Sequence, residues 1–215
     1  NSNSFWVLVF NNVNNNTVRN NTIITYGGDS YGVLLDTIVY NNLVYDNNIT
    51  TSGSGGVGVY LFKSSNNSVY NNVINTTNTN GYGVFLSRTP YYNFIYNNNI
   101  TSGGGSGGAA YGLGGSGAFY NNTIYKNIIT TLINSPQSHG ILLANSFNNT
   151  IYSNNITTLN ASSYALYLSD NNNNNTFYNN TLSSPAAGIV LNGSGQTSSE
   201  TTAFNTFTND TIVPC

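Results

Sequence analysis

Charged side chains are the first place to look for chemistry, and this chain has few of them: six acids, four bases and one histidine in 215 residues. Asp36, Lys63 and Arg88 follow one another at intervals of 27 and 25 residues, and Asp170 lies farther along in the same frame. Clustered titratable groups could bind an anion or serve a polysaccharide lyase or glycosidase. The alternative is a surface ion-pair ladder of little energetic weight. With no second carboxylate nearby, we predict no catalytic residue.

The soft and nitrogenous metal ligands are almost missing from the sequence. His139 is the only histidine, Cys215 the only cysteine, and there is no methionine. His139 occupies a place in the repeat where aromatic residues stand, so we expect it to pack or hydrogen-bond there. Copper and zinc sites need several Cys, His or Met ligands. We therefore predict no metal and no cofactor.

Composition excludes several classes of protein. Only 5% of the residues are charged, whereas 44 are Asn and 49 are Ser or Thr. Four cations cannot neutralise a run of phosphates, which argues against nucleic-acid binding. No apolar run approaches the roughly 20 residues that a bilayer requires, so we predict no membrane span in this chain.

A repeat organises the whole sequence. A phrase of Asn, a small or polar residue, Ile, Val or Phe, then usually Tyr, and again Asn recurs as NTVRNN at 16–21, NSVYNN at 67–72 and NTIYSNN at 149–155. About nine or ten residues before most copies stands an anchor, a small residue followed by an aliphatic triplet. The anchors are Gly32, Gly58, Gly83, Gly112, Gly140, Ala165 and Gly188, with Trp6 in the first copy. The repeats must be placed before any local structure is assigned.

Each repeat contains three short apolar segments, none long enough for a helix. Three short strands in a unit of about 25 residues describe one coil of a parallel β-helix. We predict an all-β, single-stranded right-handed parallel β-helix, with about eight coils of 23–29 residues and three short strands per coil. Residues 1–215 are expected to form one domain.

Stacked coils place like residues above one another. An Asn at a corner tolerates left-handed backbone and can hydrogen-bond the Asn of the next coil. The inward apolar columns are predicted to be Val18, Val44, Val69, Ile95, Ile124, Ile151 and Phe177, and Val33, Val59, Val84, Leu113, Ile141, Leu166 and Ile189.

The repeated Asn-Thr-Ile-x-x-Asn phrases resemble those of the right-handed parallel β-helix repeat proteins of the pectin-lyase-like superfamily. The resemblance covers almost the whole chain, from about Phe5 to Ile212. It implies the fold but only a range of functions, because that superfamily includes pectin and pectate lyases, polygalacturonases, a periplasmic copper-maturation group, phage tailspikes and adhesins.

Two outward columns stand out by strand alternation. The first is an aromatic stripe, suited to sugar faces or to a protein partner, or simply to strand stabilisation: Tyr45, Tyr70, Tyr96, Tyr125, Tyr152 and Tyr178. The second is apolar and predicts a subunit interface: Leu8, Leu34, Tyr60, Phe85, Leu142, Tyr167 and Val190.

Sequons for N-glycosylation are frequent, and eight are predicted as candidates for covalent glycans: Asn15, Asn20, Asn66, Asn121, Asn148, Asn174, Asn179 and Asn192. Three further sequons, at Asn48, Asn99 and Asn155, are assigned to the Asn ladder instead. Low charge and outward sequons together predict an extracellular or cell-surface protein. The leading interpretation is a non-enzymatic, self-associating subunit of a filament, surface layer or adhesive appendage. The alternative is a β-helix that binds or cleaves a polysaccharide.

Overall fold

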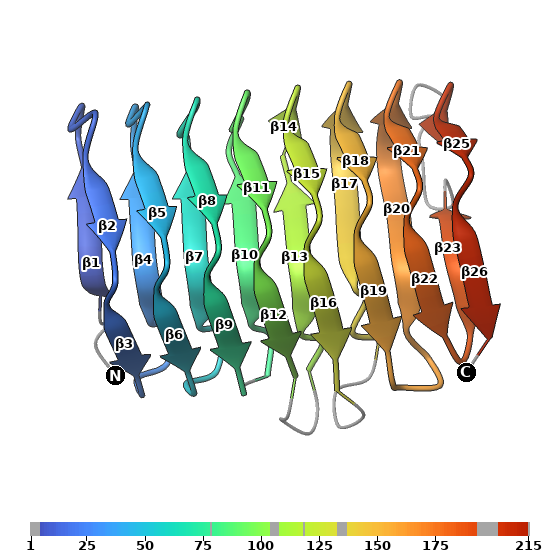
Figure 1. Ribbon diagram of the computed structural model, residues 1–215, viewed down its shortest axis with the longest axis horizontal. Helices are drawn as coiled ribbons and strands as arrows, with labels where there is room; N and C mark the ends of the chain where they lie inside the picture. The colour runs from blue at the N-terminus through green and yellow to red at the C-terminus, as the bar shows by residue number, and fades with distance from the viewer. Residues whose placement is uncertain are drawn as a thin grey trace.

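The computed structural model describes residues 5–77, 79–103, 108–117, 119–132, 137–192 and 202–214. These residues form 26 β-strands and no helix. Figure 1 shows successive coils standing side by side from the N-terminal to the C-terminal end, as in a solenoid. The predicted all-β parallel β-helix is therefore confirmed. No helix of the described residues has the length and apolar composition needed to cross a membrane.

Three parallel sheets run the length of the solenoid. Sheet A contains β1 (Phe5–Phe10), β4 (Tyr31–Asp36), β7 (Val57–Phe62), β10 (Tyr82–Ser87), β13 (Tyr111–Ser116), β17 (Ile141–Phe147), β20 (Tyr164–Asn173) and β23 (Ala187–Asn192), joined by β14 (Phe119–Tyr120) and β24 (Thr202–Ala203). Sheet B contains β2 (Thr17–Arg19), β5 (Leu43–Tyr45), β8 (Ser68–Tyr70), β11 (Phe94–Tyr96), β15 (Thr123–Tyr125), β18 (Thr150–Tyr152), β21 (Thr176–Tyr178) and β25 (Thr206–Thr208). Sheet C contains β3 (Thr22–Thr25), β6 (Asn48–Thr51), β9 (Val73–Thr76), β12 (Asn99–Ser102), β16 (Ile128–Thr131), β19 (Asn155–Thr158), β22 (Thr181–Ser184) and β26 (Thr211–Pro214). Each coil thus supplies one strand to every sheet, as predicted.

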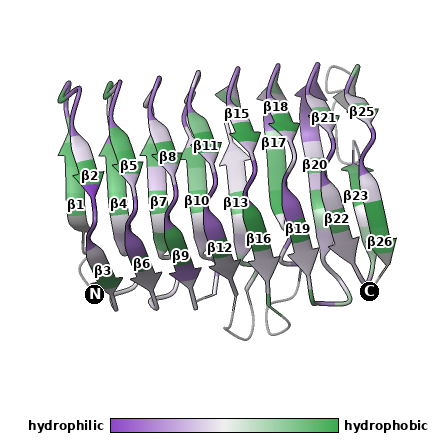
Figure 2. Cartoon of the chain, in the orientation of Figure 1, coloured by the Kyte–Doolittle hydropathy of each residue, from purple (hydrophilic) through white to green (hydrophobic). Residues whose placement is uncertain are grey.

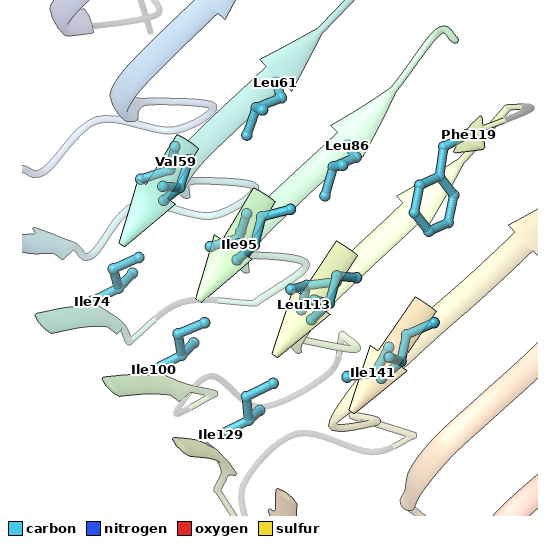
Figure 3. Close-up of a cluster of buried hydrophobic side chains, with 14 of the residues drawn as sticks. Val59, Leu61, Ile74, Leu86, Ile95, Ile100, Leu113, Phe119, Ile129 and Ile141 are labelled. Atoms are coloured by element: carbon cyan, nitrogen blue, oxygen red, sulfur yellow. The ribbon is translucent and has the colours of Figure 1, made fainter. Parts of the chain in front are cut away.

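The hydrophobic core lies between the three sheets. The predicted inward columns pair residue for residue, for example Val59 with Val84 and Ile95 with Ile124. A third column, on sheet C, is equally buried: Ile23, Ile49, Ile74, Ile100, Ile129, Ile156 and Leu182. Figure 3 shows side chains from these columns meeting in the interior, and Figure 2 shows apolar strands alternating with hydrophilic corners.

The anchor glycines are required by crowding in this core. A Cβ atom on Gly83 would lie 2.2 Å from Cγ2 of Ile100 and 2.5 Å from the carbonyl oxygen of Gly112. The same clash with a sheet C isoleucine recurs at Gly32, Gly58, Gly112 and Gly140. Only a residue without a side chain fits beside a β-branched one at this distance.

One coil departs from this pattern in two places at once. Ala165 takes the anchor position in β20, and Leu182 takes the place of isoleucine in β22, where it pairs with Ile156. Leucine has no branch at Cβ, so the methyl group that crowds the other glycines is missing from this coil. We infer that Ala165 and Leu182 compensate each other.

Replacing Gly83 with alanine tests this crowding. We expect Gly83→Ala to lower the free energy of unfolding by about 2–3 kcal/mol, as overpacking does. Adding Ile100→Leu should recover part of that loss, because it recreates the Ala165–Leu182 combination. Chemical denaturation of Gly83→Ala, Ile100→Leu and the double variant gives the coupling. Gly28→Ala is the control, since its Cβ would meet nothing nearer than 3.7 Å. No coupling between the two substitutions would contradict the proposed compensation.

Two buried asparagine ladders close the corners on either side of sheet B. Asn98 shows the pattern: its backbone N–H and its Nδ2 both donate to Oδ1 of Asn127 at 3.0 Å, and Nδ2 also donates to the Val69 carbonyl at 2.9 Å. The first ladder is Asn16, Asn42, Asn67, Asn93, Asn122, Asn149, Asn175 and Asn205. The second is Asn21, Asn47, Asn72, Asn98, Asn127, Asn154, Asn180 and Asp210.

The prediction that one Asn serves both as ladder residue and as left-handed corner is wrong. The residue immediately before each ladder position has a positive φ, as at Asn97 (54°) and Asn121 (56°), and the ladder residue follows it. The corner thus needs two residues, one to turn the backbone and one to point inward. Asn48, Asn99 and Asn155, which we had assigned to the ladder, instead begin sheet C strands and are exposed.

Asp210 ends the second ladder with a carboxylate. Its Oδ1 accepts from both the backbone N–H and Nδ2 of Asn180 at 2.8 Å, but its buried Oδ2 has no hydrogen-bond partner. In Asn180 the corresponding atom is Nδ2, which donates to the Ile151 carbonyl at 3.0 Å. A carboxylate oxygen cannot make that bond.

Asp210→Asn should therefore stabilise the protein. We expect a gain of about 1 kcal/mol, the usual contribution of one hydrogen bond. Thermal unfolding at neutral pH measures it. The reverse change, Asn180→Asp, should be destabilising because it removes the donor from the ladder interior. A lower melting temperature for Asp210→Asn would contradict this reading of the ladder.

Candidate functional site

The charged residues singled out in the sequence do not form a cluster. Asp36 ends β4 and pairs with Phe62, whereas Lys63 and Arg88 lie one residue farther on, in exposed positions with φ of 48° and 59°. The Asp36 carboxylate accepts a hydrogen bond from Oγ1 of Thr37 at 2.6 Å and makes no ion pair with either base in the described structure. Asp170, with φ of 63°, lies within β20, where the pairing with β17 is irregular, three coils beyond Arg88. The sequence places these residues in nearly one column, four or five residues after their anchors, and the structure separates Asp36 from the two bases because Asp36 still belongs to its strand.

The aromatic stripe on sheet B is present, but its ring faces are covered. Neighbouring rings from Tyr45 to Tyr178 stack with centroids 4.7–4.9 Å apart and within 9° of parallel. At the N-terminal end Nη1 of Arg19 donates to the Tyr45 hydroxyl at 3.2 Å. A sugar could reach ring edges and hydroxyls here but not the flat faces along the stripe. The stacking favours the strand-stabilising interpretation.

The apolar column on sheet A faces outward, and a second column beside it covers much of it. Leu8 is 48% exposed, whereas Leu34 is only 5% exposed and Tyr60, Phe85, Leu142, Tyr167 and Val190 are half-buried. The covering rings come from the residue before each anchor: Tyr31 packs edge-on to Tyr60 at 5.2 Å, and Tyr82 stacks on Phe85 at 4.2 Å. Self-association through this column stays a prediction.

Local backbone geometry explains why these two columns meet. In β10, Gly83 and Val84 are both buried, so strand alternation is broken and Tyr82 and Phe85 lie on the same outer face. At Gly114 the apolar column has no side chain, and the Tyr82 ring fills the space. A Cβ atom on Gly114 would lie 2.4 Å from Cε1 of Tyr82. On the outer face of sheet A, ring-to-ring contacts therefore continue from Tyr31 to Tyr167, with aliphatic side chains among them.

This surface deepens into a cleft of about 550 Å³ over the C-terminal coils. We call it the aromatic cleft. It is lined by side chains from β13, β20 and β23 and from the segments that precede β17 and β20: Tyr111, Gln137, His139, Ala161, Ser162, Tyr164, Tyr167, Val190 and Asn192. The sequence pointed to Tyr167, Val190 and His139 separately. It did not reveal that the segments before β17 and β20 contribute to one cavity with them.

His139 lies at the centre of this group of rings. Its ring is 4.5 Å from that of Tyr167, 5.0 Å from that of Tyr164 and 5.7 Å from that of Tyr111. Its Nδ1 accepts the backbone N–H of Tyr164 at 3.0 Å. Burial lowers the pKa of His139 to about 4. The imidazole is therefore neutral near pH 7 with its proton on Nε2, so it offers a hydrogen-bond donor at that atom.

The other polar groups of the cleft are neutral as well. Nδ2 of Asn192 donates to the Tyr167 hydroxyl at 2.6 Å. Burial raises the pKa of Tyr111, and the neighbouring Tyr167 raises it further. The cleft thus presents phenols, amides and an imidazole, all uncharged at neutral pH.

Most predicted sequon asparagines lie at the corners rather than in the cleft. Asn15, Asn66, Asn148 and Asn174 precede first-ladder residues and are exposed, as are Asn20 and Asn179 before second-ladder residues, while Asn121 is half-buried. Asn192 differs, because its amide is bonded to Tyr167 in the cleft. Whether any of them carries a glycan stays a prediction.

Family comparison agrees with this architecture. Residues 75–212 match the sequence model of the right-handed β-helix region. The chain belongs to the right-handed β-helix family. Residues 3–137 also match the model of the periplasmic copper-binding protein NosD. No curated protein matches the chain by sequence.

Solved β-helices resemble the chain in fold at low sequence identity. The periplasmic alginate epimerase AlgG superposes with a TM-score of 0.68 and 16% identity over 97% of this chain and 47% of AlgG. The Azotobacter vinelandii mannuronan C-5 epimerase AlgE4 A-module gives a TM-score of 0.42 and 12% identity over 91% of this chain and 75% of the module. The chain thus spans about half the length of AlgG.

These findings correct the expectation that the chain has no enzymatic role. The interpretation as a filament or surface-layer subunit drew on composition and on an outward apolar column. The β-helix structures that it resembles in fold include the periplasmic alginate epimerase AlgG instead. The carbohydrate-active alternative is the better supported of the two.

The residues do not fit the copper that the NosD description implies. Copper sites draw on imidazole, thiolate or thioether ligands. This chain has no Met, its single Cys lies outside the described residues, and Nδ1 of its single His is already engaged by a backbone N–H. Among the described residues, no three His, Cys, Asp or Glu side chains come together.

The buried histidine should make stability depend on pH. Well above pH 6.5 His139 is neutral in both states and has no effect on stability. As the pH falls from 6.5 towards 4, the unfolded chain binds a proton that the folded chain does not, so stability decreases, by up to about 1 kcal/mol per pH unit. Denaturant unfolding between pH 6.5 and 5 measures this slope, and His139→Phe should flatten it while keeping the ring packing. Equal slopes in both proteins would show that His139 does not titrate as described.

Proposed function

We propose that this chain is a carbohydrate-active β-helix that binds a polysaccharide along the outer face of sheet A, with the aromatic cleft as its principal site. The observation that carries the proposal is the cleft itself, where three tyrosines surround a histidine beside an amide and a hydroxyl. Aromatic rings accept the apolar faces of sugars, and amides and hydroxyls pair with sugar hydroxyls. The likeness to alginate epimerases in fold supports the same class of ligand.

The face also has the shape that a polymer needs. Its outward rings run from Tyr31 through Tyr82 and Tyr111 to Tyr164, in coils that repeat about every 4.8 Å. A linear chain lying along the solenoid would pass ring after ring before it reached the cleft. The sheet B stripe is less suited to this role, because its rings lie within 9° of parallel and cover one another along its length, whereas the rings around His139 meet at 15° to 39°.

The chemistry available in the cleft is that of recognition. His139 lines the cleft with a neutral imidazole that is 5% exposed, and the phenol of Tyr111 stays protonated at neutral pH. These groups can orient a sugar and hold its hydroxyls. In the polysaccharide-modifying activity that we propose for the whole protein, the described cleft residues would position the substrate.

An envelope or extracellular-side location accords with this proposal. The NosD description and the AlgG structure both name periplasmic proteins. A polysaccharide ligand would be encountered on that side of the inner membrane.

Binding to polysaccharides tests the proposal directly. Affinity electrophoresis in gels containing a panel of neutral and acidic polysaccharides should show retardation of the wild-type protein by at least one of them. Tyr164→Ala and Tyr167→Ala should each weaken the retardation about tenfold or more, since stacking rings are dominant contacts. Tyr152→Ala, on the sheet B stripe, is the matched control and should bind like the wild type. Retardation by none of the polysaccharides, or equal loss in the control, would overturn the proposal.

A further inference from the structure

The polar side chains that line the aromatic cleft are all uncharged at neutral pH. Its lining offers the amides of Gln137 and Asn192, the hydroxyl of Ser162, three phenols and one imidazole, together with the apolar Ala161 and Val190. Each of these polar groups is a neutral hydrogen-bond donor or acceptor at pH 7. No Lys, Arg, Asp or Glu is among the described residues that line the cleft.

The chain's four cations are positioned elsewhere. Arg19 is in β2 and Lys126 follows β15, so both belong to sheet B or its corner. Lys63 and Arg88 follow β7 and β10, at the far end of sheet A strands from the residues that start the cleft, and in earlier coils. The sequence segments 133–136 and 193–201, which adjoin cleft residues along the chain, contain no Lys or Arg, and their one charged residue is the acid Glu200.

A uronate polymer would be a poor ligand for such a lining. Each of its sugars carries a carboxylate, and moving an ion out of water costs several kcal/mol unless a partner of opposite charge or several donors meet it. A neutral sugar requires only hydroxyl pairing and ring contact. The donors for that pairing are fixed in place: Nδ1 of His139 is held by Tyr164 at 3.0 Å, which orients Nε2, and the Asn192 amide is held by Tyr167 at 2.6 Å.

We propose that the aromatic cleft selects an uncharged polysaccharide, in contrast to the alginate named for the AlgG structures. This inference rests on the proposed function, because it specifies the ligand class of the same site. It follows from the neutral lining that the described residues form and from the placement of every Lys and Arg elsewhere in the fold.

A comparison of matched polymers tests the inference. Affinity electrophoresis would compare three neutral polymers, a β-glucan, a galactomannan and dextran, with two uronate polymers, alginate and polygalacturonate. Each would be run at about 20 mM and about 500 mM NaCl, because the higher salt concentration shortens the screening length to a few ångströms. At least one neutral polymer should bind ten times or more tightly than either uronate polymer. Its affinity should change less than twofold with salt and should fall about tenfold in Tyr167→Ala.

A charge-insertion variant makes the test sharper. Ser162 is exposed at the wall of the cleft, so Ser162→Lys should raise uronate affinity severalfold at low salt. The same variant should leave neutral-polymer binding within twofold. Ser162→Ala is its uncharged control.

The outcomes separate the two proposals. Tighter, salt-sensitive binding of alginate that is lost in Tyr167→Ala would overturn the neutral-ligand inference and keep the cleft as a polysaccharide site. Alginate binding that is lost in Lys63→Ala or Arg88→Ala and unchanged in Tyr167→Ala would overturn both, because it would place the site elsewhere on sheet A. Binding of no polymer would likewise overturn both.

Discussion

The hydrogen bonds between neighbouring coils determine which residues can stand at each position of the repeat. Coils repeat at about 4.8 Å, so each backbone group and each side chain stands directly over its equivalent. At the corners this means that an inward asparagine must pair with an asparagine, and its Oδ1 accepts two hydrogen bonds while its Nδ2 donates to the coil before. Except at Asp210, the ladders satisfy the buried polar atoms on both sides of sheet B without charged groups.

The same repetition explains both the stacked tyrosines and the crowded glycines. Rings in register cover one another, so the sheet B stripe stabilises strands and exposes little of its aromatic faces. Isoleucines in register leave no room for a Cβ atom opposite them at Gly32, Gly58, Gly83, Gly112 and Gly140. Where the column changes to Leu182, the anchor changes to Ala165. A substitution at one position of a coil is thus tied to a partner elsewhere in the same coil.

Much of the fold could be predicted from the sequence because the repeat carries it. The anchors, the inward columns and three strands per coil follow from the spacing alone. The two-residue division of each corner did not follow, since adjacent asparagines such as Asn97 and Asn98 are chemically identical and only the backbone separates their roles. The end of a strand likewise cannot be located to one residue by pattern, so the sequence did not show that Asp36 still belongs to β4 while Lys63 and Arg88 lie beyond β7 and β10.

The candidate site was harder to predict because it lies where the repeat is broken. His139 replaces a tyrosine, Gly114 leaves a gap that Tyr82 fills, and the segments before β17 and β20 add Gln137 and Ser162 as a wall. A regular column presents the same group at every coil and so cannot distinguish one sugar from the next. Departures from the repeat supply a cavity with different groups on different sides, which is what binding a specific ligand requires. In this β-helix the regular columns stabilise the stacked coils, and the irregular positions form the cavity that we propose binds the ligand.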